Sequence, residues 1–274
     1  MITASIVIYN SPEKDLRTII TCVARSMVSI IYVIDNASND NLEKMVENLS
    51  EKVIYIQGQG NVGYGAAHNI AMREAIRQGA KYHLVVNPDI EFQEGVIEKL
   101  ATFMDEHPDV GQLIPRIVYP GGELQYVCNL IPTPYDLFIR RFAPAMKNKK
   151  FRLKFTGHDQ LMNVPYHHGC FMFFSVAGLI EVGLFDERFF MYPEDIDMTR
   201  RMHEKYKTLY YPFVDVVHAH TAASRKSVKM LRIHIVNLIR YFNKWGWFFD
   251  AKRRKTNKKV LKELGYYPEK GKIT

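Results

Sequence analysis

The sequence has few cysteines and no long apolar run. Its 274 residues include only three cysteines, which are far apart and odd in number: Cys22, Cys128 and Cys170. This pattern argues against a disulfide framework and against a CxxC metal site. No apolar stretch approaches the roughly 18 residues that a membrane-spanning helix needs, and Met1-Ile2-Thr3 leads into a strand-like segment without a basic region or cleavage site. The sequence therefore indicates a protein of the reducing cytoplasm.

Acidic residues are scarce near the end of the sequence. The whole chain has a net charge of +8, but residues 225–274 hold 15 Lys and Arg against 3 Asp and Glu, so they carry about +12 and residues 1–224 about −4. The same segment contains both tryptophans and a cluster of other aromatic residues: Tyr241, Phe242, Trp245, Trp247, Phe248 and Phe249. Basic and aromatic residues together are typical of a segment that lies on an anionic membrane surface. A solvated basic end of the chain, or a segment that attracts nucleic acid, would explain the positive charge but not the aromatic residues. We prefer the membrane surface and expect no nucleic-acid partner.

The first 110 residues alternate strand-like and helix-like segments. Strands are predicted at 5–9, 30–34, 53–56 and 84–86, and helices after Ser11-Pro12, after Asp35, over 66–77 and over 95–106. Alternation with short connections favours an α/β fold with a doubly wound, mostly parallel sheet flanked by helices.

Beyond Gly111 the pattern becomes irregular. Residues 132–165 contain several prolines and a run of Lys and Arg, which predicts a long functional loop. Regular structure is predicted again at 169–174, a buried strand, in a helix from about 176, in a helix that starts at the acids 194–197, and in short strands at 209–211 and 214–217.

Polar side chains follow the ends of three predicted strands. Tyr9-Asn10 ends the first, Asp35 the second and Asn87-Pro88-Asp89 the fourth. Because parallel strands bring their carboxyl ends to one edge, where open α/β sheets bind ligands, we expect these residues to converge. Asp35 could accept a base N–H, and Asp89 could hold a divalent cation between two phosphates, since such a cation takes oxygen ligands and keeps waters. Each acid could instead cap a helix, which for Asp89 would begin near Phe92.

A second group of acids, Glu194-Asp195-Ile196-Asp197, follows the apolar segment 189–192. Acids at a helix N-terminus are often surface charges that the helix dipole favours. The apolar neighbours predict partial burial instead, which raises the pKa of a carboxyl group and suits a general base. His218-Ala219-His220 ends a strand, and His167-His168 precedes one, so each pair offers a candidate metal ligand, although such pairs are more often structural.

The segment from Gly58 to Gly63 matches the GxGxxG pattern between a strand and a helix. A dinucleotide site would explain the pattern. It follows the third strand rather than the first, however, and the later acid of that motif is missing. A tight strand-to-helix connection is therefore the preferred interpretation.

Five segments, taken in order, resemble the family-2 inverting glycosyltransferases, and most closely the rhamnosyltransferase-like branch that builds bacterial surface polysaccharides. They are residues 6–10, 33–38, 61–65, 87–89 and 185–197. The resemblance implies a GT-A fold, with a nucleotide-sugar-binding half at 1–110 and an acceptor-binding and catalytic half at 111–224. The composition adds a basic, aromatic-rich helical extension at 225–274.

The resemblance also implies roles for individual residues. The nucleotide sugar would contact Tyr9, Asn10, Asp35, Asn61, Gly63, Asn87 and Asp89. A Mn²⁺ or Mg²⁺ ion would be held by Asp89 and His218, and Asp195, beside Glu194, would be the catalytic base. The chain departs from the family's DxD-type motif at Asn87, a neutral side chain where the motif has an acid.

The reaction implied is a single displacement that inverts the anomeric carbon. The acceptor hydroxyl would lose its proton to Asp195, and the metal would stabilise the diphosphate that leaves. The resemblance favours dTDP-rhamnose as the donor, with UDP- and GDP-sugars as alternatives, and a polyprenyl-diphosphate-linked glycan at the cytoplasmic face of the inner membrane as the acceptor. A sugar nucleotidyltransferase would need a Gly-rich basic loop after the first strand, where Asn10-Ser11-Pro12-Glu13 stands. A non-catalytic binding module would not need the acids at 194 and 195.

Overall fold

The computed structural model describes residues 1–137, 150–219 and 228–266. Its N-terminal part confirms the predicted alternation of strands and helices. The strands are β1 (Ile2–Ile8), β2 (Ile30–Asp35), β3 (Val53–Ile56) and β4 (Tyr82–Val86), and the helices are α1 (Glu13–Ala24), α2 (Glu43–Glu47) and α3 (Tyr64–Arg77). The four strands pair in parallel, with β1 between β2 and β4. Their nearly continuous apolar sequences suit strands covered on both faces.

The second part of the chain contributes strands of both directions. It contains β5 (Ile90–Phe92), α4 (Val96–Glu106), β6 (Val110–Val118), β7 (Cys128–Asn129), η2 (Lys154–Thr156), β8 (Met162–Asn163), β9 (Tyr166–His167), β10 (Phe171–Ser175), α6 (Val176–Val182), α7 (Glu194–His203) and β11 (Lys207–His218). Nine strands form one sheet in the order β3-β2-β1-β4-β10-β6-β11-β5, with β8 beside β11. Six of them run in the direction of β1, whereas β5, β8 and β10 run against it. The sheet is therefore mostly parallel with antiparallel insertions, as in a GT-A fold.

Two local predictions were wrong, and one strand was missed. Residues 90–92 form a strand rather than the start of a helix, so Asp89 caps no helix there. The strand β6 was not predicted, because Pro115 interrupts its apolar pattern. The two short strands expected at 209–217 are one strand, β11, whose register against β6 shifts between Tyr211 and Asp215.

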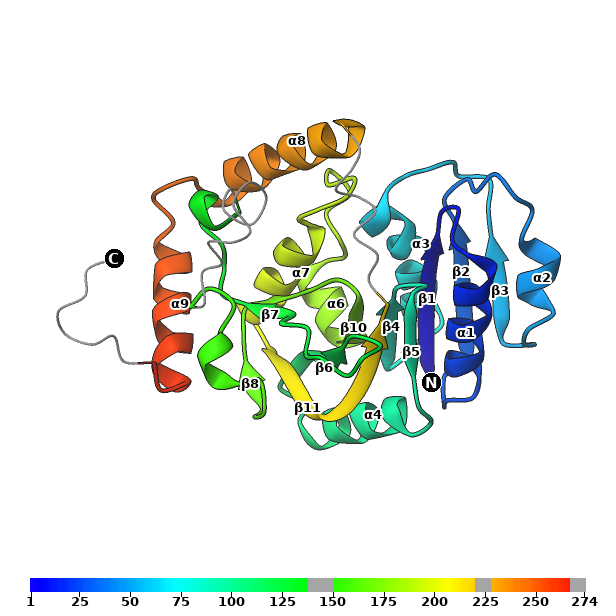
Figure 1. Cartoon of the computed structure of the whole chain (residues 1–274), viewed down its shortest axis with the longest axis horizontal. Coiled ribbons are helices and arrows are strands. Elements are labelled where there is room, and N and C mark those ends of the chain that lie inside the picture. Colours follow the sequence, from blue (N-terminus) through cyan, green and yellow to red (C-terminus); the bar gives the residue numbers. More distant parts are fainter. Residues whose placement is uncertain (138–149, 220–227, 267–274) are drawn as a thin grey trace.

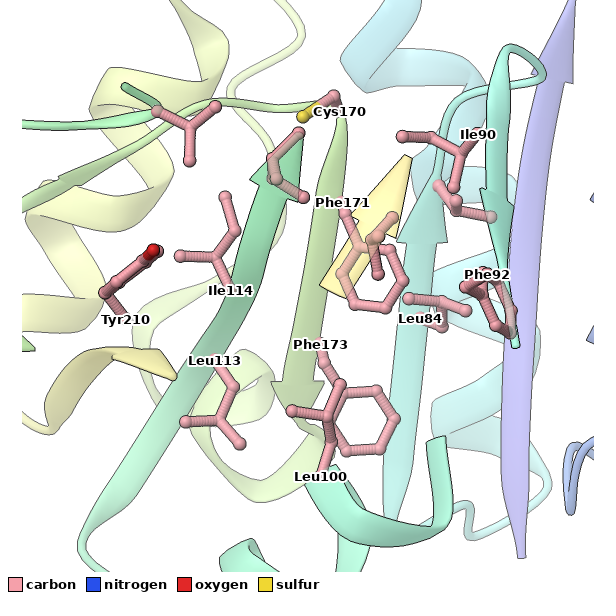
Figure 2. Close-up of a cluster of buried hydrophobic side chains, with 14 of the residues drawn as sticks. Leu84, Ile90, Phe92, Leu100, Leu113, Ile114, Cys170, Phe171, Phe173 and Tyr210 are labelled. Carbon is pink, nitrogen blue, oxygen red and sulfur yellow. The ribbon is translucent and has the colours of Figure 1, made fainter. Parts of the chain in front are cut away.

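The main core lies where the parallel and antiparallel parts of the sheet meet. Figure 2 shows side chains of β4, β5, β6, β10 and α4 packed together there, among them Leu84, Phe92, Leu100, Leu113 and Phe173. All are nearly or fully buried. Burial of each such side chain contributes roughly 1.5–3 kcal/mol, so this cluster joins the two parts of the chain into one sheet.

The basic extension is folded onto the rest of the protein. It forms α8 (Val228–Trp245) and α9 (Ala251–Glu263), with α8 running beside α7 and α9 at the end of the molecule opposite β3 (Figure 1). Two of its aromatic residues, Tyr241 and Phe242, are buried. Three others in the loop between the helices are exposed, Trp247 by 38%, Phe248 by 69% and Phe249 by 91%. Within the described residues, no helix has the length and apolar character needed to cross a membrane.

Candidate active site

The ends of β1 and β2 are adjacent, as the sequence predicted. Ile8 pairs with Asp35 in the parallel ladder. Beyond the strands, the Asn10 backbone N–H donates to Ser38 Oγ at 3.1 Å, and the Asn10 side-chain oxygen accepts from the Asn39 N–H at 2.9 Å. Asn10 has a positive φ of 50°, a conformation that Asn adopts more readily than most residues. Tyr9 and Asn10 thus lie exposed beside the loop that follows Asp35.

Asp35 is buried and held from two sides. Its Oδ1 accepts from the Ser38 backbone N–H at 2.7 Å, and its Oδ2 accepts from the Tyr55 hydroxyl at 2.5 Å. Burial, followed by this hydrogen bond and the charge of Asp35, raises the pKa of Tyr55 beyond its ordinary range. Tyr55 therefore stays protonated as a donor, and the carboxylate keeps one orientation with lone pairs left to accept from a ligand.

Tyr64, the first residue of α3, connects the end of β4 with the start of β10. Its hydroxyl lies 3.1 Å from Asn87 Oδ1 and donates to the Gly169 carbonyl at 2.6 Å. Burial raises the pKa of Tyr64 well above its usual value, and so do the charges around it, which come from Glu194, Cys170, Asp195 and Asp89 in that order. Gly169 also donates its N–H to Asp195, so it joins the Tyr64 hydroxyl to the acid of α7.

His218, at the end of β11, faces Asp89. Its Nε2 lies 3.4 Å from Asp89 Oδ1, and its Nδ1 lies 3.0 Å from Gln125 Oε1. Gln125 is itself fixed, because its Nε2 donates to the His218 carbonyl at 2.7 Å. Burial lowers the pKa of His218, but Cys170 and Asp89 outweigh that effect and raise it to about 10. This corner of the site therefore attracts positive charge.

The pair Asp89–His218 fits a divalent cation in its donor chemistry. A histidine that binds a metal usually donates its other ring N–H to an oxygen, as the contact with Gln125 allows. Within residues 1–137, 150–219 and 228–266, no three His, Cys, Asp or Glu side chains are arranged to hold a metal ion. Two protein ligands are nevertheless enough for Mg²⁺ or Mn²⁺ when phosphate oxygens and waters complete the shell. His220 lies outside the described residues.

In the other candidate pair, His167 belongs to the buried interior. His167 in β9 is fully buried, and its backbone N–H points toward Thr199 of α7. Burial lowers the pKa of His167 to about 3, so the ring is neutral. The structural interpretation is therefore the better one for His167.

Glu194 and Asp195 are buried at the N-terminus of α7, as expected from the apolar residues before them. Asp195 accepts from the Gly169 N–H at 3.1 Å through Oδ2 and from the Ile196 N–H at 2.8 Å through Oδ1. Burial, and then the charge of Asp195, raises the pKa of Glu194 well above its usual value. Burial and the neighbouring charge thus disfavour the ionised form of Glu194, whereas the two backbone N–H groups favour a carboxylate at Asp195.

Gly63 brings this acid pair close to α3. It has a φ of 90°, and a Cβ at this position would lie 2.3 Å from the Phe190 carbonyl oxygen. The Tyr64 N–H donates to that same oxygen at 2.9 Å, and Asn61 Oδ1 accepts from the Gly63 N–H at 3.2 Å. The last glycine of the GxGxxG pattern thus permits contact between two segments, in agreement with a tight connection.

The extension holds α7 through Asp197, which is fully buried. Asp197 Oδ1 accepts from Lys244 Nζ at 2.6 Å and from the Trp245 indole N–H at 2.8 Å. Arg201, on the next turn of α7, donates to Oδ2 at 2.8 Å. The third acid of the cluster is therefore a structural anchor, two residues from Asp195.

A second anchor lies further along α7. Arg200 forms a buried ion pair with Asp250 at 2.8 Å, and its guanidinium lies 3.9 Å from the centre of the Trp245 ring. Asp250 also caps α9, since its side chain accepts from the Arg253 N–H. Removal of one partner from a buried pair of this kind costs about 3–5 kcal/mol. The extension thus holds α7, the helix that carries Glu194 and Asp195, in position.

Sequence reasoning did not single out Tyr55, Tyr64, Gln125 or Cys170. Tyr64 lies in one of the five segments that carry the resemblance, residues 61–65, so its position directly after Gly63 could have identified it as a site residue. Gln125 carries no local signal, since it meets His218 across 93 residues.

Comparison with known protein families matches residues 3–183 to "Glycosyl transferase family 2". The matched region includes β1, α3, Asp89 and the turn between β9 and β10 that contains Gly169. The chain belongs to this family.

Two relatives of this chain are also named as glycosyltransferases. A low-salt glycan biosynthesis hexosyltransferase of Haloferax volcanii is 29% identical over 201 residues, which cover 72% of this chain and 60% of the relative. An N-acetylglucosaminyl-diphospho-decaprenol L-rhamnosyltransferase of Mycobacterium tuberculosis is 24% identical over 225 residues, 72% of each chain. The family-2 enzyme thus spans about 60% of the length of the haloarchaeal protein.

A solved structure supports the fold. A mannosyltransferase from Pyrobaculum calidifontis, in complex with GDP-mannose and Mn²⁺, aligns with a TM-score of 0.57 at 15% identity and covers 98% of this chain and 76% of its own. This family-2 glycosyltransferase therefore has the GT-A fold that the resemblance implied.

Proposed function

We propose that this glycosyltransferase is inverting and metal-dependent, and that it moves a sugar from a nucleoside diphosphate to a hydroxyl of a lipid-linked bacterial surface glycan. The observation that carries the proposal is that Tyr64 contacts Asn87 at the end of β4 and, through Gly169, the buried Asp195, while Asp89 of the same strand end faces His218. The rhamnosyltransferase relative supports rhamnose as the transferred sugar, and dTDP-rhamnose is the donor that the sequence resemblance favours. A UDP- or GDP-sugar would fit the same side chains.

The donor would bind along the carboxyl ends of β1, β2 and β4. Asp35 would accept an N–H of the base, and Tyr9 and Asn10 would lie beside it. Asn61, Gly63 and Asn87 would lie along the donor between Asp35 and Asp89; in support, the Gly63 carbonyl accepts from Asn36, the neighbour of Asp35. The diphosphate would then reach the corner formed by Asp89 and His218, where a bound cation would lie between it and these side chains.

Asp89 and His218 would hold the cation, which supplies charge stabilisation to the departing diphosphate when it is bound. Gln125 would keep the His218 ring oriented. Asp195 would remove the proton from the acceptor hydroxyl, because two backbone N–H groups hold its carboxylate in place. Glu194 would remain protonated beside it, so that the pair accepts one proton.

The first test is calorimetric binding of dTDP, UDP, GDP and NAD, each with and without Mn²⁺. We expect one nucleoside diphosphate to bind only with metal, and Asp89→Ala to lose that binding by at least about tenfold. Asp109→Ala is the matched control, because Asp109 forms an exposed ion pair with Lys207 outside the site. Tight binding of NAD without metal would overturn the proposal.

The membrane association is proposed for the exposed aromatic loop and the basic helix α9. Removal of everything after residue 224 would be a poor test, because it also removes the partners of Asp197 and Arg200. The double change Phe248→Ser/Phe249→Ser leaves those contacts in place. We expect it to weaken binding to phosphatidylglycerol vesicles by about tenfold.

The matched control is Ile180→Ser/Phe213→Ser, which removes two side chains that are also more than 60% exposed. This control should bind vesicles like the unmodified protein. Equal loss in both double variants, or in neither, would contradict the role of the loop.

A further inference from the structure

A cavity of about 830 Å³ lies between α9 and the segments around residues 130–136 and 150–151. Its volume is near the upper end of the range for small-molecule sites. Much of its lining is apolar or aromatic: Leu130, Ile131, Phe151, Trp247, Leu261 and Tyr266. It is separate from the strand ends that form the candidate active site.

The walls of the cavity are held in fixed positions. Asn257 of α9 accepts from the Ile131 N–H and donates to the Ile131 carbonyl, both at 2.9 Å. Arg253, one turn earlier and buried, donates to the Pro132 carbonyl at 3.4 Å. Two polar side chains of α9 therefore bind the backbone of the opposite wall, so the cavity has a defined shape.

Cations line one side of the cavity. Arg254, Lys258 and Lys262 follow each other at intervals of four residues, so they form one row along α9. All three are exposed, and Lys150 stands on another part of the lining. One acid also lines the cavity: Asp136, which accepts from the Thr133 N–H and hydroxyl. Among the described lining residues, the balance is thus strongly positive.

The cavity is next to the most exposed apolar residues of the extension. Phe248 lines it and is 69% exposed, and its neighbour Phe249 is 91% exposed. Arg254 donates to the Phe248 carbonyl at 3.2 Å, which ties this loop to the row of cations. An apolar chamber, a cationic row and an exposed aromatic edge are therefore continuous.

We propose that this cavity binds the lipid end of a phosphate-bearing isoprenoid, with the hydrocarbon against the apolar lining and the phosphates against the row Arg254, Lys258 and Lys262. The charge of the row complements a phosphate head, and the aromatic edge gives a hydrocarbon chain a route from a membrane surface. The choice of an isoprenoid rests on the proposed function, since it is the lipid class of the proposed acceptor. The cavity is then a second binding site, which holds the lipid carrier while the glycan reaches Asp195.

The experiment measures calorimetric binding of farnesyl diphosphate to the full chain without divalent metal, so that the diphosphate site at Asp89 is not formed. Farnesol and inorganic diphosphate are the two partial probes. We expect farnesyl diphosphate to bind at least about tenfold more tightly than either, because only it uses both the apolar lining and the cations.

Two charge-reversal variants of α9 distinguish binding in the cavity from electrostatic attraction of the ligand to the whole basic surface. Lys258→Glu/Lys262→Glu changes the row in the cavity, and Lys255→Glu/Lys259→Glu makes the same change in net charge at exposed positions outside it. The first should weaken binding by about tenfold or more and the second by less than about twofold. All four lysines are exposed, so both variants should fold.

Equal weakening in the two variants would overturn the inference, because it would indicate attraction to the whole basic surface. Inorganic diphosphate that binds as tightly as farnesyl diphosphate would also overturn it, since the ligand would then be a free phosphate. The same samples are titrated with the nucleoside diphosphate and Mn²⁺. If that binding persists while farnesyl diphosphate fails, only the lipid site is wrong; if it fails too, so is the proposed function.

Discussion

Trp245→Phe tests whether the extension supports the catalytic helix. The substitution keeps most of the aromatic ring but removes the N–H that donates to buried Asp197 at 2.8 Å. A hydrogen bond to a charged group contributes about 1.5–3 kcal/mol, and Lys244 and Arg201 remain to hold the carboxylate. We therefore expect the free energy of unfolding to fall by about 2–3 kcal/mol, a substantial part of a typical total of about 5–15 kcal/mol.

Trp247→Phe is the matched control in the same extension. Its indole N–H also donates at 2.8 Å, but to the neutral side chain of Asn243, and the residue is 38% exposed. A neutral hydrogen bond contributes about 1 kcal/mol or less at such a position. Urea unfolding of the two variants should therefore differ by about 1–2 kcal/mol.

Turnover of the same variants shows whether the contact positions the base. Asp197 lies two residues from Asp195, so we expect Trp245→Phe to lower kcat by about tenfold while the KM for the donor changes by less than about twofold. Trp247→Phe should leave both constants unchanged. Equal losses of stability and activity in the two variants would refute the reasoning.

Three further outcomes are expected. Glu194→Gln should retain most of the turnover, because it resembles the protonated acid, whereas Asp195→Asn should lower kcat by at least about 10³-fold with nucleotide binding intact; the reverse result would exchange their roles. Because the pKa of Glu194 is raised in the folded state, its contribution to stability is complete below its unfolded pKa of about 4.5 and is lost as the pH rises toward the folded pKa. Unfolding followed from pH 5 to 9 should show this loss in the unmodified protein and a flatter profile in Glu194→Gln; parallel profiles would contradict the burial of a neutral acid. Tyr64→Phe removes the donor to the Gly169 carbonyl and the contact with Asn87, so metal-dependent nucleotide binding should weaken by about three- to tenfold in calorimetry. An unchanged affinity would exclude Tyr64 from organising the site.

The parallel half of the fold could be predicted because its signals are local. Each strand is a short apolar run, each helix follows within a few residues, and Asp35 and Asp89 follow strand ends directly. The antiparallel insertions could not be predicted in this way. Pro115 hides β6, and the two parts of β11 look like separate strands because the register shifts between them.

Several contacts at the candidate site could not be predicted either, because they join residues that are far apart in the sequence. The contact of Gln125 with His218 joins residues 93 positions apart, and that of Trp245 with Asp197 joins residues 48 positions apart. Composition marked 225–274 as aromatic and basic, but it cannot distinguish Tyr241, which is buried against the protein, from Phe249, which faces solvent. Pairings of this range become visible only when the chain is folded.

The residues of the extension that hold α7 come late in the chain, and this order has a consequence for synthesis on the ribosome. The strands β1 to β4 can pair as soon as residues 1–86 have emerged, because their partners precede them in the chain. The partners of Asp197 and Arg200 on the extension, by contrast, are translated about fifty residues after α7 begins. A nascent chain would therefore form the strand edge that carries Asp35 before the helix that carries Asp195 is fixed, so the proposed nucleotide site would begin to assemble before the proposed base is in place.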